Sequence, residues 1–172
     1  HEEEDAVTEQ WDAFEKAIKS EMLEGQFYEE HAVKASHSLI KVLFEWMASE
    51  EWAHHKSLKK LHAELQAHGK LPDDILSMTK KTSIQDFLED LIKKDSSLTK
   101  ISSDDLIIVR KAIVLEEKVT TFYEHLRDKA SDPKDRALFE TFLSYEHEHL
   151  QSLKYAEAFL AKSSGPLNYF NS

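Results

Sequence analysis

The chain has 172 residues, of which 41% are hydrophobic and 32% charged, and its net charge is −11. This length allows a sizeable core in one domain, and the hydrophobic fraction is that of a globular protein, not of a disordered one. The negative charge argues against nucleic-acid binding, because neutralising phosphates requires an excess of Lys and Arg. No hydrophobic run approaches the roughly 18 residues of a membrane-spanning helix, so no membrane association is predicted.

The chain contains no cysteine. Disulfides, thiolate metal ligands, iron–sulfur clusters and cysteine nucleophiles are therefore excluded. No signal peptide is visible in the sequence, and a cytoplasmic location is expected. Only 3 Gly and 3 Pro occur. Because so few residues interrupt helices, the composition favours long helices.

The first half of the chain shows the periodicity of two long amphipathic helices. They are predicted at about residues 5–35 and 37–67. Gly69, with Pro72 just beyond it, marks the end of the second helix, since glycine readily takes the left-handed conformation that ends helices. These two helices form a predicted hairpin with a short turn.

The second half shows the same design. A third helix starts near Ser103, an N-cap residue followed by two acidic residues that suit a helix N-terminus, and it ends near residue 130. The fourth helix follows the segment Ser131-Asp132-Pro133, a cap with a proline in the first turn. It is predicted to end at about residue 162, before Gly165-Pro166.

The two predicted hairpins are joined by about thirty residues, at about 70–103, which include a predicted short helix at 83–94. Short turns within each pair and one long connection between pairs are typical of ferritin-like bundles. The sequence therefore predicts an all-α fold, a ferritin-like antiparallel four-helix bundle with a long crossover. We expect residues 1–172 to form a single domain.

The two hairpins repeat each other at a constant offset of 95 residues, with no gap. A unit of this length that occurs only twice is not a solenoid repeat, and it predicts a pseudo-symmetric bundle. The matching segments are Ala17-Ile18 with Ala112-Ile113, Glu21 with Glu116, Phe27-Tyr28-Glu29 with Phe122-Tyr123-Glu124, Leu43-Phe44-Glu45 with Leu138-Phe139-Glu140, and Ser57-Leu58-Lys59 with Ser152-Leu153-Lys154.

A Glu-x-x-His motif occurs once in each hairpin, as Glu51 with His54 and as Glu146 with His149. Residues at i and i+3 are neighbours on one face of a helix, so each motif places a carboxylate beside an imidazole. The chain has 10 His, but only these two follow a Glu by three residues. Both motifs also match at the repeat offset, which makes surface ion pairing a poor explanation for them.

Four glutamates lie on the apolar faces of the predicted helices, namely Glu21, Glu51, Glu116 and Glu146. In each hairpin the two glutamates lie fifteen residues from the turn, so both fall at one level, about 22 Å from it. A buried carboxylate without a partner costs several kcal/mol, so four together require cations. Two divalent ions would balance the four charges. Carboxylate and imidazole ligands suit iron, manganese or zinc better than calcium.

This pattern resembles the ferritin-like di-iron carboxylate superfamily, and most closely the rubrerythrins. The resemblance rests on Ala-Ile-x-x-Glu-x-x-x-x-x-Phe-Tyr and Glu-x-x-His, each present twice, and it covers nearly the whole chain. It implies a non-haem di-iron centre that reacts with hydrogen peroxide or dioxygen. It also implies that Tyr28 and Tyr123 lie close to the metal ions, which makes them candidate catalytic residues.

The sequence departs from the rubrerythrin pattern in two places. Rubrerythrins usually carry a further Glu three residues after the ligand of the third long helix, where this chain has Val119. The equivalent position in the first helix is Glu24, which becomes a seventh candidate metal ligand. A rubredoxin domain is also absent, since the chain has no cysteine. We therefore expect a separate electron-donor protein, and we expect the chain itself to form a homodimer.

The predicted function is that of a non-haem di-iron oxidoreductase that reduces hydrogen peroxide in oxidative-stress defence. Its predicted cofactor is a pair of iron ions, with manganese or zinc as alternatives. Three other functions use the same ligands: a ferroxidase or iron-handling protein, a di-manganese catalase, and a metal-binding bundle without catalysis. The sequence does not distinguish among them.

Overall fold

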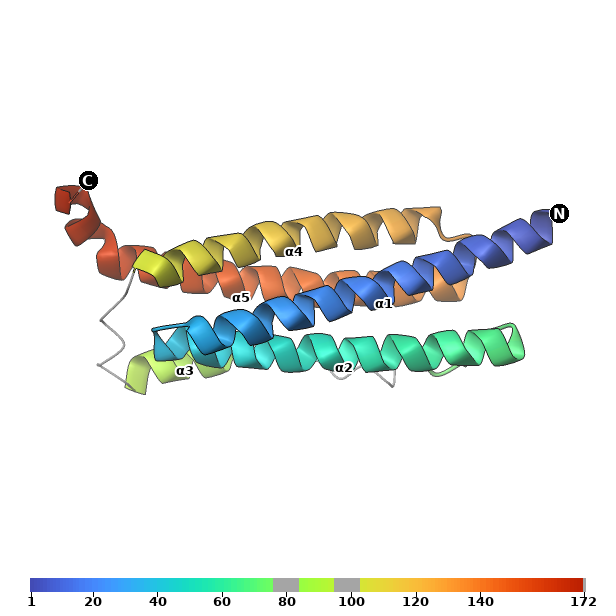
Figure 1. The fold of residues 1–172 in the computed structure, drawn as a ribbon, viewed down its shortest axis with the longest axis horizontal. Helices are drawn as coiled ribbons and strands as arrows, with labels where there is room; N and C mark the ends of the chain where they lie inside the picture. The colour runs from blue at the N-terminus through green and yellow to red at the C-terminus, as the bar shows by residue number, and fades with distance from the viewer. Residues whose placement is uncertain (76–83, 95–102, 172) are drawn as a thin grey trace.

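The computed structural model describes residues 1–75, 84–94 and 103–171, and the side chains of these residues as far as residue 162. Within these ranges the chain is all α-helical, as predicted. Four long helices lie side by side and a short one lies near one end (Figure 1). The helices are α1 (Glu2–Lys34), α2 (Ser38–His68), α3 (Gln85–Lys94), α4 (Ser103–Lys129) and α5 (Pro133–Asn171).

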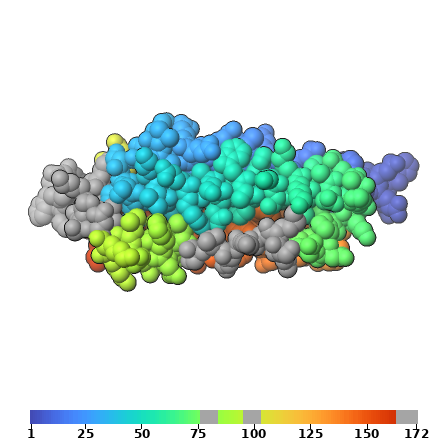
Figure 2. Space-filling model, turned by 90° about the horizontal axis from the view of Figure 1, so that it is seen from below, coloured from blue at the N-terminus to red at the C-terminus, as the bar shows by residue number. Residues whose placement is uncertain are grey.

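The four long helices form two antiparallel hairpins. α1 packs along α2, α4 packs along α5, and α1 also contacts α4. α2 and α4 run in the same direction, because the connection between them returns the chain to the end where α2 began (Figure 1). α3 belongs to this connection and packs against α2 (Figure 2). Among the described residues, no helix is long and apolar enough to cross a membrane.

Helix ends follow the capping residues of the sequence. Gly69 ends α2 in the left-handed conformation, with φ at 71°, and its N–H donates to the carbonyl oxygen of Leu65 at 2.8 Å. The side chain of Asp132 caps α5 by accepting from the N–H of Lys134 at 2.8 Å. α2 has a less usual cap, because Nδ1 of His37 accepts from the N–H of Leu39 at 3.1 Å.

The end of the fourth long helix is the clearest error of the sequence analysis. α5 does not stop at about residue 162 but continues through Gly165-Pro166 to Asn171. A proline removes one helical hydrogen bond and collides with the carbonyl four residues earlier, which kinks a helix and need not end it. α5 bends at this end (Figure 1).

The core consists of two apolar clusters with a polar layer between them. On α1, for example, Phe14 and Ala17 belong to one cluster and Tyr28 and Ala32 to the other. The residues between them that point inward are acidic, and the same order holds on α2, α4 and α5. The apolar clusters hold the helices together and so position the polar layer midway along the bundle.

Each hairpin also reaches the turn of the other. The N–H of Ser36, in the α1–α2 turn, donates to Asp105 of α4 at 3.0 Å. At the opposite end, Nε2 of Gln10 on α1 donates to Asp135, in the first turn of α5, at 2.7 Å. Gln10 and Asp105 are equivalent in the repeat. These two contacts tie the hairpins together at both ends, in accordance with the pseudo-symmetry.

Candidate metal centre

The polar layer contains all six glutamates and histidines of the repeated motifs. Each long helix contributes because its apolar stripe faces the core, and the acidic residue lies within that stripe. Burial is almost complete. The exposed fraction is 0% for Glu21, Glu51, Glu116 and Glu146, 6% for His54 and 2% for His149.

These six residues form two overlapping groups of potential metal ligands. In each group, one ligand atom from each of four residues lies within 4.8 Å of all the others. Two glutamates, Glu51 and Glu146, belong to both groups and therefore lie between the two positions. The first group adds Glu21 and His54, and the second adds Glu116 and His149.

The ligand atoms have few partners of their own. Among the described residues, no hydrogen bond reaches either oxygen of Glu51 or of Glu146, and Nδ1 of His54 and of His149 meets the carboxylates in ion pairs. Buried carboxylate oxygens without donors are strongly unfavourable unless a cation is present. The donor set of carboxylate oxygen and imidazole nitrogen fits iron, manganese or zinc. The residues therefore fit the metal centre that the sequence predicted.

The two histidines direct the same nitrogen into the layer. Nδ1 of His149 lies 2.8 Å from Oε1 of Glu51 and 3.7 Å from Oε2 of Glu146. Nδ1 of His54 lies 3.7 Å from Oε2 of Glu21. Each Nδ1 thus faces the carboxylates of its own group, as a metal ligand must.

Crowding of carboxylates in the core shifts their pKa values. Burial, together with the neighbouring Glu146, raises the pKa of Glu51 and of Glu116 well above the ordinary value. Burial raises the pKa of Glu146 to about 8. Glu21 behaves differently. Burial opposes its ionisation, but contacts with Glu51 and His54 lower its pKa to about 2. Like charges at this range cannot all ionise, which is why such a cluster attracts cations.

Tyr28 and Tyr123 both lie against the carboxylates, each with an exposed fraction of 0%. The hydroxyl of Tyr28 donates to Oε1 of Glu116 at 2.5 Å, and the hydroxyl of Tyr123 donates to Oε1 of Glu21 at 2.6 Å. Each tyrosine therefore forms a hydrogen bond between α1 and α4. Its acceptor is a glutamate that belongs to only one of the two ligand groups. Burial and this carboxylate raise the pKa of both tyrosines well above 10, so both hydroxyls remain donors.

Glu24 is also buried in the layer, with an exposed fraction of 0%, although it belongs to neither group of four. Val119, its equivalent in the repeat, belongs to the apolar cluster that contains Phe14 and Tyr123. Glu117, next to a candidate ligand, is exposed. On α4, therefore, Glu116 faces the core and Glu117 faces away from it.

Two aromatic residues beside the histidines were not identified as part of the site. The ring of Tyr145 stacks on that of His54, with centroids 4.9 Å apart. Trp46 meets the ring of His149 edge to face at 5.6 Å. Both contacts join α2 to α5. Spacing along one helix carries no signal for them, because they depend on how two helices pack.

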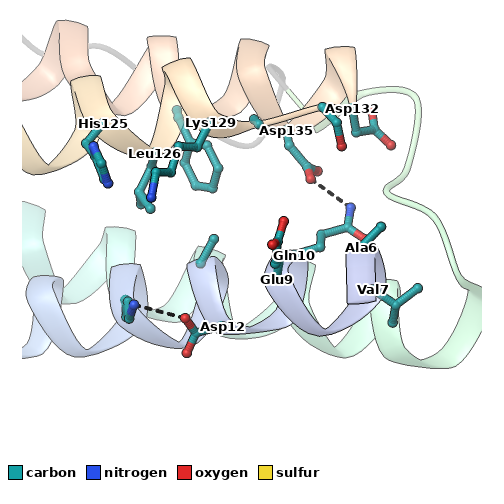
Figure 3. A pocket seen from close by; sticks show the side chains of 15 residues that line it. Ala6, Val7, Glu9, Gln10, Asp12, His125, Leu126, Lys129, Asp132 and Asp135 are labelled. Atoms are coloured by element: carbon teal, nitrogen blue, oxygen red, sulfur yellow. Dashed lines mark hydrogen bonds and ion pairs between the residues drawn. The ribbon is translucent and has the colours of Figure 1, made fainter. Parts of the chain in front are cut away.

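A cavity of about 580 Å³ lies away from this layer, between the N-terminal part of α1 and the turn between α4 and α5. Gln10 and Asp135 face each other across it (Figure 3). Phe139 lines it, and its ring is 6.5 Å from that of Tyr123. None of the candidate metal ligands lines this cavity.

The fold and the layer together define a class: an antiparallel four-helix bundle with paired carboxylate and histidine ligands in its core. A profile of the rubrerythrin family matches residues 12–157, which include every candidate ligand. The chain therefore belongs to the rubrerythrin family, a ferritin-like di-iron family. Comparison with curated proteins gave no match, and comparison with solved structures gave none either.

Proposed function

We propose that this protein is a di-iron peroxidase that reduces hydrogen peroxide to two molecules of water, using two electrons and two protons. The observation that carries the proposal is the pair of overlapping ligand groups in the core of a rubrerythrin-family bundle. Two metal positions that share ligands suit a two-electron reaction, because each position can supply one electron.

The residues have separate roles in holding the metal pair. Glu51 and Glu146 are the shared ligands, since they belong to both groups. His54 serves the first position and His149 the second. The terminal ligands Glu21 and Glu116 complete the first and the second group. When bound, the iron pair supplies the electrons and the oxygen-binding site at which peroxide is reduced.

The surrounding residues control protons and water. The hydroxyls of Tyr28 and Tyr123 stay protonated and orient the terminal carboxylates through their hydrogen bonds. The two apolar clusters on either side keep bulk water away from it. In such an environment charges interact strongly, which favours tight and specific placement of the ligands.

The electrons come from outside the chain. It has no cysteine, so it holds no iron–sulfur group of its own. A separate one-electron donor protein must therefore reduce the centre twice in each cycle. The cytoplasmic location, the homodimer and the extent of the single domain stay predictions.

Metal analysis and assays on the same preparation test the proposal. Protein purified with iron available should hold close to two iron ions per chain and should consume peroxide only when an electron donor is present. Oxygen release from peroxide without a donor would indicate a catalase, and oxidation of added ferrous iron without peroxide turnover would indicate a ferroxidase. Metal without either activity would indicate a binding protein.

Two variants separate the site from the rest of the bundle. Glu146→Ala removes a shared ligand and should abolish peroxide reduction. Glu117→Ala alters an exposed residue of α4 and should leave the activity unchanged. Full activity of Glu146→Ala would contradict the proposed site.

A further inference from the structure

Glu24 is the one buried acid of the layer that the pseudo-symmetry does not explain. Its side chain is fully buried, and among the described residues neither carboxylate oxygen has a hydrogen-bond partner. Its equivalent in the second hairpin is Val119, an apolar residue. A buried carboxylate without a donor is costly, so its presence on one side only requires a function.

The position of Glu24 favours one of the two ligand groups. It lies one turn before Tyr28 on the same face of α1, and the hydroxyl of Tyr28 donates to Glu116. Burial raises the pKa of Glu24, and the charge of Glu116 adds more to this rise than that of Glu146 or of Glu21. Glu116 belongs only to the group that contains His149, whereas Glu146 belongs to both groups, so it is Glu116 that assigns Glu24 to this position.

We infer that Glu24 makes the two metal positions unequal, by adding a carboxylate to the position formed by Glu116 and His149. The inference rests on the proposed metal centre. The position formed by Glu21 and His54 has no such addition, because Val119 stands where the symmetric carboxylate would be. The Glu116/His149 position therefore binds a divalent ion more tightly and fills first.

The physical reason is the weak screening of charge in the core. In a site that excludes water, one more carboxylate within a few ångströms of a cation adds a large attraction. Removing a group that supports a metal site typically lowers affinity by roughly 10- to 100-fold. A difference in affinity of this size is enough for one metal position to fill before the other.

Limited metal loading tests the inference without any activity measurement. Crystals of the protein prepared with one Mn²⁺ ion per chain should show a stronger anomalous peak at the Glu116/His149 position. In Glu24→Gln, which keeps the side-chain size, the two peaks should become nearly equal. In the exchange variant Glu24→Val with Val119→Glu, the stronger peak should move to the Glu21/His54 position.

A measurement in solution supplies the second test. Mn²⁺ affinity should fall by about tenfold or more on adding Glu24→Gln to His54→Ala, a background that keeps the Glu116/His149 position intact. The same change in His149→Ala should leave the affinity nearly unchanged. Circular dichroism of each variant confirms that it is folded.

The outcomes separate this inference from the proposed function. Equal peaks in the unaltered protein, or a bias that persists in Glu24→Gln, would overturn the inference while leaving the metal centre in place. Equal losses of affinity in the two histidine backgrounds would do the same. Failure of the unaltered protein to bind Mn²⁺ or iron at either position would refute the metal centre, and the inference with it.

Discussion

The two hairpins carry the same candidate ligands but differ in the residues that surround them. In the first hairpin, a Cβ atom added to Gly25 of α1 would lie 2.9 Å from the ring of Trp52 on α2. At the equivalent positions the second hairpin has Thr120, which is buried, and His147, which is exposed. The hydroxyl of Thr120 donates to the carbonyl oxygen of Glu116 at 2.8 Å, within its own helix.

This difference shows how a repeated structure can diverge around a constant site. A large indole on one helix is compatible with the bundle only where the facing helix lacks a side chain. Where the indole is replaced by an outward-facing histidine, the facing helix carries Thr. In the first hairpin the two positions pack against each other, and none of these four residues belongs to the ligand groups. Glu24 and Val119 differ in the same layer, but that difference changes the charge of the site.

The largest expected effect concerns the two glutamates that belong to both ligand groups. Glu51→Ala and Glu146→Ala should each disturb both metal positions, because each residue belongs to both groups. His54→Ala and His149→Ala should each weaken one position only. Metal content by elemental analysis should therefore fall further in the glutamate variants, and all four should lose most peroxidase activity. A histidine variant that releases both ions as readily as a glutamate variant would contradict two separate positions.

The next effect is the dependence of stability on pH after metal is removed with a chelator. Burial raises the folded-state pKa of Glu24, Glu51 and Glu116, and that of Glu146 to about 8. The folded protein then binds more protons than the unfolded chain, so the stability present below the unfolded pKa is lost as pH rises through the folded values. The free energy of unfolding should be at least about 2 kcal/mol lower at pH 8 than at pH 5.

Other groups of the layer change this result little. Although burial opposes protonation of His54, the Glu21 carboxylate raises its pKa, and the resulting stability is also lost as pH rises. Burial lowers the pKa of His149, which has the opposite effect, but it is a single group. Glu24→Gln should flatten the pH dependence, because it removes the carboxylate that only the first hairpin has. Urea unfolding at pH 5 and pH 8 measures this dependence in the unaltered protein and in Glu24→Gln. A free energy of unfolding that rises with pH would contradict burial of the cluster.

A smaller effect tests whether the two halves are equivalent at the tyrosines. Tyr28→Phe and Tyr123→Phe each remove one hydrogen bond to a buried carboxylate. Each should lower the free energy of unfolding of the metal-free protein at pH 7 by about 1–3 kcal/mol, and by similar amounts. Tyr145→Phe is the control, because its hydroxyl forms no hydrogen bond within the described residues. A large loss in one variant only would show that the symmetry does not extend to these bonds.

The smallest effect concerns the packing that differs between the hairpins. Gly25→Ala should lower the free energy of unfolding by about 1 kcal/mol, because crowding against Trp52 outweighs the gain in helix propensity. In a Trp52→Ala background the same change should be stabilising, by up to about 1 kcal/mol. Urea unfolding of the unaltered protein, the two single variants and the double variant gives the coupling free energy between Gly25 and Trp52. Stabilisation by Gly25→Ala in the unaltered protein would show that the indole moves aside at little cost.

Much of the fold could be predicted from local patterns. The helices, the turns and the long crossover follow from periodicity and capping residues, because these act within a few residues of each other along the chain. The repeat and the equal spacing of the glutamates from each turn also indicated that one ligand from each long helix falls at the same level. The exception was the end of α5, where Gly165-Pro166 bends the helix and does not end it.

What the sequence by itself determined, therefore, is the set of ligand-bearing faces, since helical spacing places Glu51 beside His54 and Glu146 beside His149. Only the tertiary structure decided which glutamates are shared between the two groups, which carboxylate each tyrosine reaches, and where Glu24 lies. It also decided that the ring of Trp52 occupies the space beside Gly25. These features depend on distances between side chains of different helices. Such distances are set by how the helices pack, and spacing along the chain does not encode them.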